Sequence, residues 1–91
     1  MKKYVIERNI PKVHCMGPEE LKGAAATSNE ALAKLSPRVQ WLHSYVTPDK
    51  TFCIYLAEDE GAVREHAELS GFPANVISEV TTTIDPSTAH A

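Results

Sequence analysis

The sequence is short of cysteine, glycine and long apolar runs, and each shortage excludes a class of protein. Among its 91 residues, the two cysteines Cys15 and Cys53 are too few for a disulfide framework and predict reduced thiols. Four glycines leave no glycine-rich loop that could hold a phosphate group. No apolar run approaches the ~20 residues that a membrane-spanning helix needs. We therefore expect that the protein is not stabilised by disulfides, has no glycine-rich phosphate-binding loop and does not span a membrane.

Positive charge is scarce as well. The 12 acidic side chains outnumber the 9 lysines and arginines, which gives a net charge of -3. This balance argues against nucleic acid or an anionic membrane as the partner. The basic start Met1-Lys2-Lys3 is followed too soon by Glu7 and Arg8 to be a secretory signal, so we expect a cytoplasmic location.

The signatures of common enzymes are also missing. The chain has no Gly-x-Ser-x-Gly, no P-loop, no Gly-x-Gly-x-x-Gly and no His-Glu-x-x-His. A nucleophile pair of Cys53 and His43 would need an orienting group and an oxyanion donor, which the sequence does not identify. The sequence favours a binding protein over an enzyme and leaves catalysis open.

The apolar periodicity and the turn residues predict four strands and two helices. Pro18 begins the first helix and Pro37 ends it. An acidic first turn and Gly71 bound the second helix. The strands cover residues 3–10, 39–46, 51–57 and 76–84, and the helices cover residues 18–36 and 58–70.

This order is β-α-β-β-α-β, the ferredoxin-like arrangement. It predicts an α+β fold with one four-stranded antiparallel sheet and both helices on one face. Residues 1–86 form the predicted single domain, and residues 87–91 form a flexible C-terminal tail. A domain this small has a thin core, and a partner subunit would enlarge it.

Strand alternation predicts which side chains face away from the helices. In the second strand, Leu42 and Val46 are assigned to the helix side, so Trp41, His43 and Tyr45 face outward. Two large aromatic side chains on an uncovered face predict a homodimer in which two sheets pack face to face. An exposed aromatic patch on a monomer is the alternative.

The third strand carries two competing signals. Its more apolar set predicts that the helix side holds Phe52, Ile54 and Leu56, which turns Cys53 and Tyr55 outward beside His43. A strict two-residue turn would instead pair Ser44 with Cys53 and place Cys53 opposite His43, unless a one-residue bulge intervenes. We give the hydrophobic pattern more weight.

The outer strands complete the predicted face. In the first strand Ile6, in one set with Tyr4 and Arg8, belongs to the core, and Glu7 faces outward. In the last strand Val80 and Ile84 are assigned to the core, and Glu79 faces outward.

A face that carries Glu7, His43, Cys53 and Glu79 would suit a divalent transition metal such as nickel, zinc, copper or cobalt. No local spacing such as Cys-x-x-Cys supports this set. His43 could equally form a hydrogen bond at a dimer interface, and Cys53 could be a buried apolar thiol.

Three other residues are possible metal ligands. His66 lies on the apolar side of the second helix, where it is either a core histidine or a surface ligand. The loop pair His14-Cys15 could chelate a soft metal, although adjacent loop residues of this kind are more often incidental.

Several blocks of the chain resemble one family of small bacterial ferredoxin-like proteins, catalogued as a domain of unknown function and described as nickel-binding. The blocks are residues 3–11, 18–21, 39–46, 64–67 and 71–80, including Val39-Gln40-Trp41-Leu42-His43 and Gly71-Phe72-Pro73-Ala74-Asn75. The resemblance covers residues 3–86. It implies a ferredoxin-like homodimer that binds nickel, for metal sequestration or tolerance. The candidate ligands are His43, Cys53, His66, Glu7 and Glu79.

Two other functions remain open. One is an enzyme or small-ligand carrier of the dimeric α/β-barrel type, with a pocket between the facing sheets lined by Trp41, His43, Tyr45 and Tyr55. The other is an interaction module whose dimer surface is its whole function.

Overall fold

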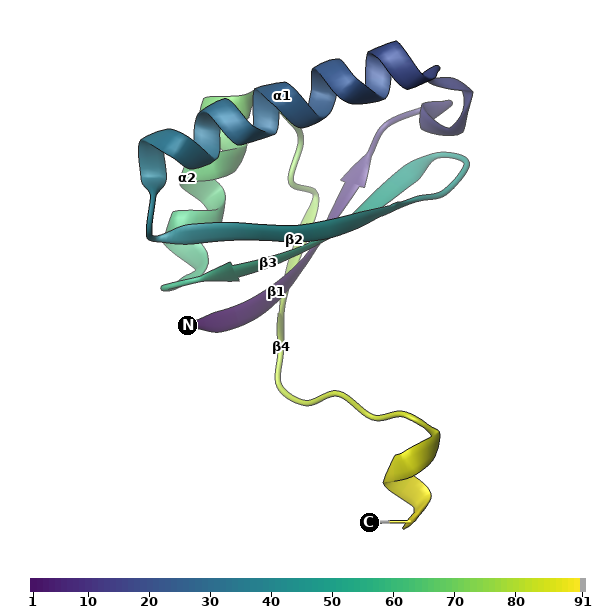
Figure 1. Ribbon diagram of the computed structural model, residues 1–91, viewed down its shortest axis with the longest axis vertical. Coiled ribbons are helices and arrows are strands. Elements are labelled where there is room, and N and C mark those ends of the chain that lie inside the picture. The colour runs from purple at the N-terminus through teal and green to yellow at the C-terminus, as the bar shows by residue number, and fades with distance from the viewer. Residues whose placement is uncertain (91) are drawn as a thin grey trace.

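Four antiparallel strands form one sheet in the order β2-β3-β1-β4, and both helices cover the same face of it (Figure 1). The computed structural model describes residues 1–90, so the last residue of the predicted tail, Ala91, lies outside them. The elements are β1 (Lys2–Asn9), α1 (Pro18–Leu35), β2 (Val39–Val46), β3 (Lys50–Ala57), α2 (Glu60–Ser70) and β4 (Val76–Val80). Two short 3-10 turns are η1 (Val13–Cys15) and η2 (Pro86–His90). The predicted β-α-β-β-α-β fold is confirmed.

Both helices begin and end where the sequence signals them. Pro18 occupies the first turn of α1, where its missing N–H costs no hydrogen bond. In α2 the Asp59 carboxylate accepts a hydrogen bond from the Ala62 N–H at 2.9 Å. Gly71 ends α2 with φ 78°, a left-handed conformation that glycine adopts without strain.

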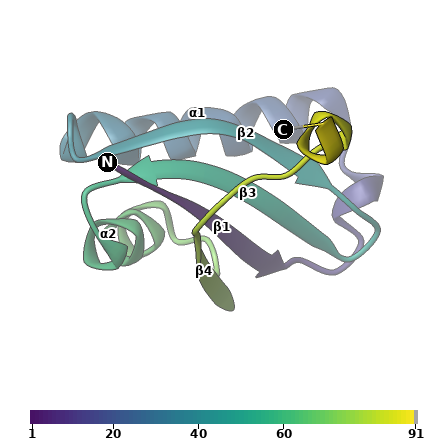
Figure 2. The ribbon, with the colours of Figure 1, turned by 90° about the horizontal axis from the view of Figure 1, so that it is seen from below.

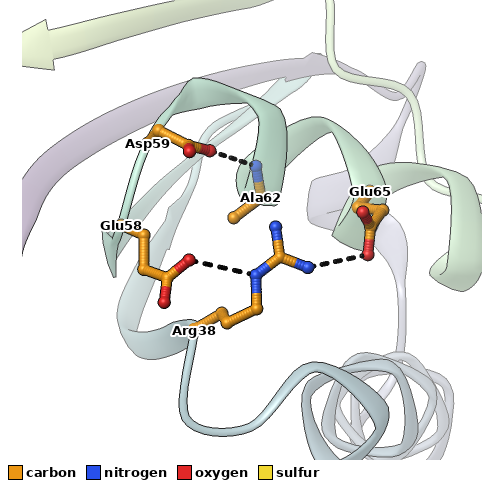
Figure 3. A network of polar contacts seen from close by, with 5 residues as sticks. All are labelled: Arg38, Glu58, Asp59, Ala62 and Glu65. Carbon is orange, nitrogen blue, oxygen red and sulfur yellow. Dashed lines mark hydrogen bonds and ion pairs between the residues drawn. The ribbon is translucent and has the colours of Figure 1, made fainter.

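Charged side chains tie the start of β2 to α2 (Figure 3). Arg38 Nε donates to Glu58 at 3.1 Å, and its Nη1 donates to Glu65 at 3.2 Å. All three side chains are more than a third exposed, so each pair contributes little to the free energy of unfolding. The network links the residue before β2 to the N-terminal half of α2 without adding much stability.

A β-bulge at Leu42 sets the orientation of β2. Trp41 pairs with Tyr55 and His43 pairs with Ile54, so the register shifts between them and Leu42 has no partner. Trp41 therefore faces the helices, where its Nε1 donates to Ser44 Oγ at 3.0 Å. The predictions that Trp41 faces outward and that Leu42 belongs to the core were wrong: Leu42 is 45% exposed.

The face assignment of β3 was also wrong. Ser44 pairs with Cys53, as the two-residue turn predicted, so Cys53 and Tyr55 are buried under the helices. Phe52, Ile54 and Leu56 lie on the open face, which is the sheet face away from the helices, and they are only half-buried. The bulge that would have rescued the hydrophobic assignment lies at Leu42, too far along the hairpin to reverse Cys53.

The last strand is shorter than predicted. β4 ends at Val80, which pairs with Lys3 and lies on the open face, and Ile84 beyond it is 76% exposed. The prediction that Val80 and Ile84 belong to the core was therefore wrong. Glu79 pairs with Tyr4 on the helix side, not the predicted open side, although its side chain stays exposed.

The chain after β4 projects away from both helices (Figures 1 and 2). Residues 81–90 are exposed throughout, including the turn η2. Seen from below, this C-terminal arm, residues 81–90, passes in front of the strands on the side away from α1 (Figure 2). Within the described chain, nothing covers the open face.

The core lies between the helices and the inner side of the sheet. Ile6, Val63 and His66 are its largest fully buried side chains. The inner positions of the central strands contribute Tyr4, Cys53, Tyr55 and Ala57, and α1 contributes Leu35. Because only one face is packed within the chain, the open face carries a second set of apolar residues.

Loss of the α2 cap should measurably weaken the fold. We expect Asp59→Ala to lower the free energy of unfolding by about 1 kcal/mol, because the Ala62 N–H loses its acceptor. Urea unfolding followed by circular dichroism measures the change. Glu68→Ala, an exposed position of the same helix, is the control and should change stability by less than about 0.5 kcal/mol. Equal effects of the two substitutions would contradict the capping role.

Candidate functional site

The open face is a mainly apolar surface crossed by three rows of paired residues. Because paired residues share a face, the strand register fixes each row. The rows are Tyr45, Phe52, Glu7 and Val76; His43, Ile54, Val5 and Ser78; and Gln40, Leu56, Lys3 and Val80.

Two of the five candidate ligands lie on this face. His43 is exposed on the edge strand β2, and its ring meets the Tyr45 ring edge-on at a centroid distance of 5.0 Å. Glu7 is half-buried on β1, with Lys50 Nζ 3.4 Å from its carboxylate. Strand β3 lies between them, so within one chain the two side chains belong to different rows and different strands. The outward position of Glu7 and His43 is confirmed.

The other three candidates lie elsewhere. Cys53 is 6% exposed under the helices, and its Sγ donates to Thr51 Oγ1 at 3.6 Å. Glu79 forms an ion pair with Lys2 at 3.6 Å. Among residues 1–90, no three His, Cys, Asp or Glu side chains come together as a group that could hold a metal ion. The prediction that Glu7, His43, Cys53 and Glu79 share one face of the sheet was therefore wrong.

His66 lies in a buried polar cluster, which is His66 with Ser28, Tyr55 and Arg8. Its Nε2 is 3.1 Å from Ser28 Oγ, its ring lies 5.0 Å from that of Tyr55, and its Nδ1 has no partner within residues 1–90. Burial, and next the charge of Arg8, lower the pKa of His66 from 6.5 to about 4. Burial also raises the pKa of Tyr55. Both side chains are thus neutral near pH 7.

Arg8 is the residue of this cluster that sequence reasoning passed over. It is 2% exposed, and its Nη1 donates to the Pro73 carbonyl oxygen at 2.8 Å. Its Nη2 has no hydrogen-bond partner in the described chain. The signal was present, because Arg8 alternates in phase with the core residues Tyr4 and Ile6, and an arginine at an inward strand position is unusual.

The loop residues His14 and Cys15 bring two potential metal donors into contact. Cys15 Sγ lies 3.5 Å from His14 Nε2, and both side chains are exposed. His14 Nδ1 is also 2.8 Å from the Pro48 carbonyl oxygen, which fixes the ring. Two donors alone leave at least half of the positions around a divalent transition metal to other ligands.

A cavity of about 470 Å³ lies between α1 and the sheet. Trp41 and Tyr55, two of the four aromatic residues expected around a pocket between facing sheets, line this cavity instead. His43 and Tyr45 lie on the opposite side of the sheet.

Within the described chain no helix is long and apolar enough to cross a membrane.

The family model described as nickel responsive protein SCO4226-like matches residues 4–80. The crystal structure of SCO4226 from Streptomyces coelicolor A3(2) superposes with a TM-score of 0.76 at 15% sequence identity, and covers 90% of this chain and 99% of that one. At this identity the likeness shows the fold alone. No curated protein matches the chain.

The depressed pKa of His66 should make stability depend on pH. The unfolded chain binds a proton at His66 near pH 6.5 and the folded chain only near pH 4, so protonation favours unfolding. The contribution of neutral His66 to the free energy of unfolding is therefore fully present above pH 6.5. Roughly 3 kcal/mol of it is lost as the pH falls to 4.

Urea unfolding between pH 7.5 and 4 tests this dependence. His66→Gln should flatten the pH slope relative to that of the unmodified protein. Titration of the His66 ring by NMR in the unmodified protein gives the same quantity directly. A ring pKa near 6.5 would refute the burial argument.

Proposed function

Because this chain belongs to the SCO4226-like family of nickel-responsive proteins, we propose that two copies pair through their open faces and bind nickel between them. The proposal rests on one structural observation above all: of the His, Cys, Asp and Glu side chains in the four strands, only Glu7 and His43 lie on the open face. Imidazole nitrogen and carboxylate oxygen are donors that suit nickel.

The number of donors favours a site shared between copies. One chain offers two ligands on this face, His43 and Glu7, on strands that β3 separates. Two ligands are too few for a stable ion site. A twofold interface presents the same surface from both copies, so each donor occurs twice. Two imidazoles and two carboxylates would then form a nitrogen and oxygen set of the kind that binds Ni(II) in tetragonal geometry.

The apolar part of the open face supports a second copy as its cover. Val5, Phe52, Ile54 and Leu56 form a continuous patch across β1 and β3 that nothing in the described chain covers. The C-terminal arm leaves the sheet on the same side and carries Ile84, which is 76% exposed. Packing against a second copy would bury both features. Sequestration would suit such a site, because the ion could leave only as the copies separate.

The first test concerns assembly. Ile54 is the β3 member of the central row, between His43 and Val5, so we expect Ile54→Lys to convert a dimer into a monomer of 10.0 kDa, because a charge cannot be buried there unpaired. Sedimentation equilibrium measures the mass. Leu69→Lys, at an exposed apolar position of α2, should remain dimeric. A monomeric unmodified protein would overturn the assembly proposed here.

The second test concerns the metal. We expect calorimetric titration of the unmodified dimer to show saturable nickel binding, and His43→Gln and Glu7→Gln each to weaken it at least tenfold, since each removes two ligands from a shared site. Glu68→Gln, at an exposed position of α2 away from the open face, is the matched control for Glu7→Gln and should bind as the unmodified protein does.

Variants of the remaining candidates discriminate between sites. Cys53→Ser and Cys15→Ser should leave nickel affinity unchanged, because neither thiol lies on the open face. Loss of binding in Cys15→Ser would move the site to the His14 loop. Binding that survives both His43→Gln and Glu7→Gln would refute the open-face site.

A further inference from the structure

The cavity under α1 combines an apolar wall with a single buried charge. On the α1 side it is lined by Leu21, Ala24, Ala25 and Ser28, and the loop before α1 adds Val13 and Met16. Strands β2 and β3 contribute Trp41 and Tyr55 to the opposite wall. Its volume of about 470 Å³ lies within the range of small-molecule sites in proteins.

Arg8 is the only charged residue among those that line this cavity. Its guanidinium carbon lies 6.0 Å from the Tyr55 ring centre and 5.8 Å from that of Phe72, so aromatic faces flank it. None of the ion pairs formed within residues 1–90 includes Arg8. A buried cation without a carboxylate partner is costly, and Nη2 has no acceptor among residues 1–90.

We propose that this cavity binds a small molecule with an apolar body and one carboxylate, and that Arg8 pairs with the carboxylate. The guanidinium fork matches the two oxygens of a carboxylate. One cation neutralises one negative charge, which favours a carboxylate over a phosphate dianion. The hydroxyls of Ser28 and Tyr55, which also line the cavity, lie in the same polar cluster and can donate to the anion.

This site is separate from the proposed nickel site. Arg8 and Trp41 face the helices, whereas His43 and Glu7 lie on the other side of the sheet. Binding of the carboxylate should therefore not require metal, and the experiment is carried out with the full chain in the presence of a chelator. Its failure would leave the nickel proposal untouched, and the reverse also holds.

Trp41 provides the readout, because it is the only tryptophan and lines the cavity. The probes are decanoate, decanol and decylamine below their micelle concentrations, which share one apolar chain and differ in charge. We expect decanoate to change Trp41 emission saturably and to raise the melting temperature. Decylamine should bind at least tenfold more weakly. Equal affinity for decanoate and decylamine would overturn the role of Arg8.

Two substitutions test the charge of Arg8 and the volume of the cavity separately. Arg8→Met should weaken decanoate binding at least tenfold but preserve decanol binding, whereas Arg64→Met, on the exposed side of α2, should alter neither. Ala25→Leu fills the cavity from a helix that tolerates leucine, and should block all three probes. Decanoate binding that survives Ala25→Leu places the ligand elsewhere, and absence of decanoate binding to the unmodified protein refutes the proposal outright.

Discussion

The pairing of β2 with β3 decides which side chains this protein presents on each side of its sheet. A two-residue turn fixes the register near the loop, where Thr47 N–H donates to the Lys50 carbonyl oxygen at 2.9 Å and Ser44 pairs with Cys53. The bulge at Leu42 then reverses the phase of β2, so that Trp41 turns inward while His43 stays outward. Without the bulge, Trp41 and His43 would lie on the same face of β2. The position of Trp41 in the cavity wall depends on this bulge, whereas the outward position of His43 follows from the register that the turn sets.

The sheet thereby separates two kinds of chemistry. Its inner side holds a buried polar cluster in which Arg8 lies beside the neutral His66. Its outer side is apolar, with His43 and Glu7 as the residues whose donors suit a transition metal. A thin sheet with helices on one face has two surfaces to bury, and a short chain can cover only one of them. The second surface is where we place the partner copy.

The elements were predictable because their signals are local. Pro18, Asp59 and Gly71 mark helix ends through backbone chemistry that needs no tertiary contact, and the strand over residues 39–46 has the predicted bounds. Hydrophobicity gave the wrong face for β3, since Phe52 and Ile54 are more apolar than Cys53 and Tyr55 and still lie on the open face. The outward positions of His43 and Glu7 were correctly predicted, but Cys53 and Glu79 were assigned to a face that they do not occupy.

The sequence by itself determined the order of elements, the ferredoxin-like fold and the placement of Glu7 opposite Ile6, because periodicity and end signals act over a few residues. Only the tertiary structure decided that Trp41 lines a cavity, that Ile84 stands outside the core, and that Arg8 is buried beside His66 without a carboxylate partner in the described chain. Ile84 is exposed because β4 ends at Val80. The cavity and the buried Arg8 arise where segments distant in sequence meet. Their positions depend on a register and a bulge that cost little locally and are selected by packing across the whole sheet.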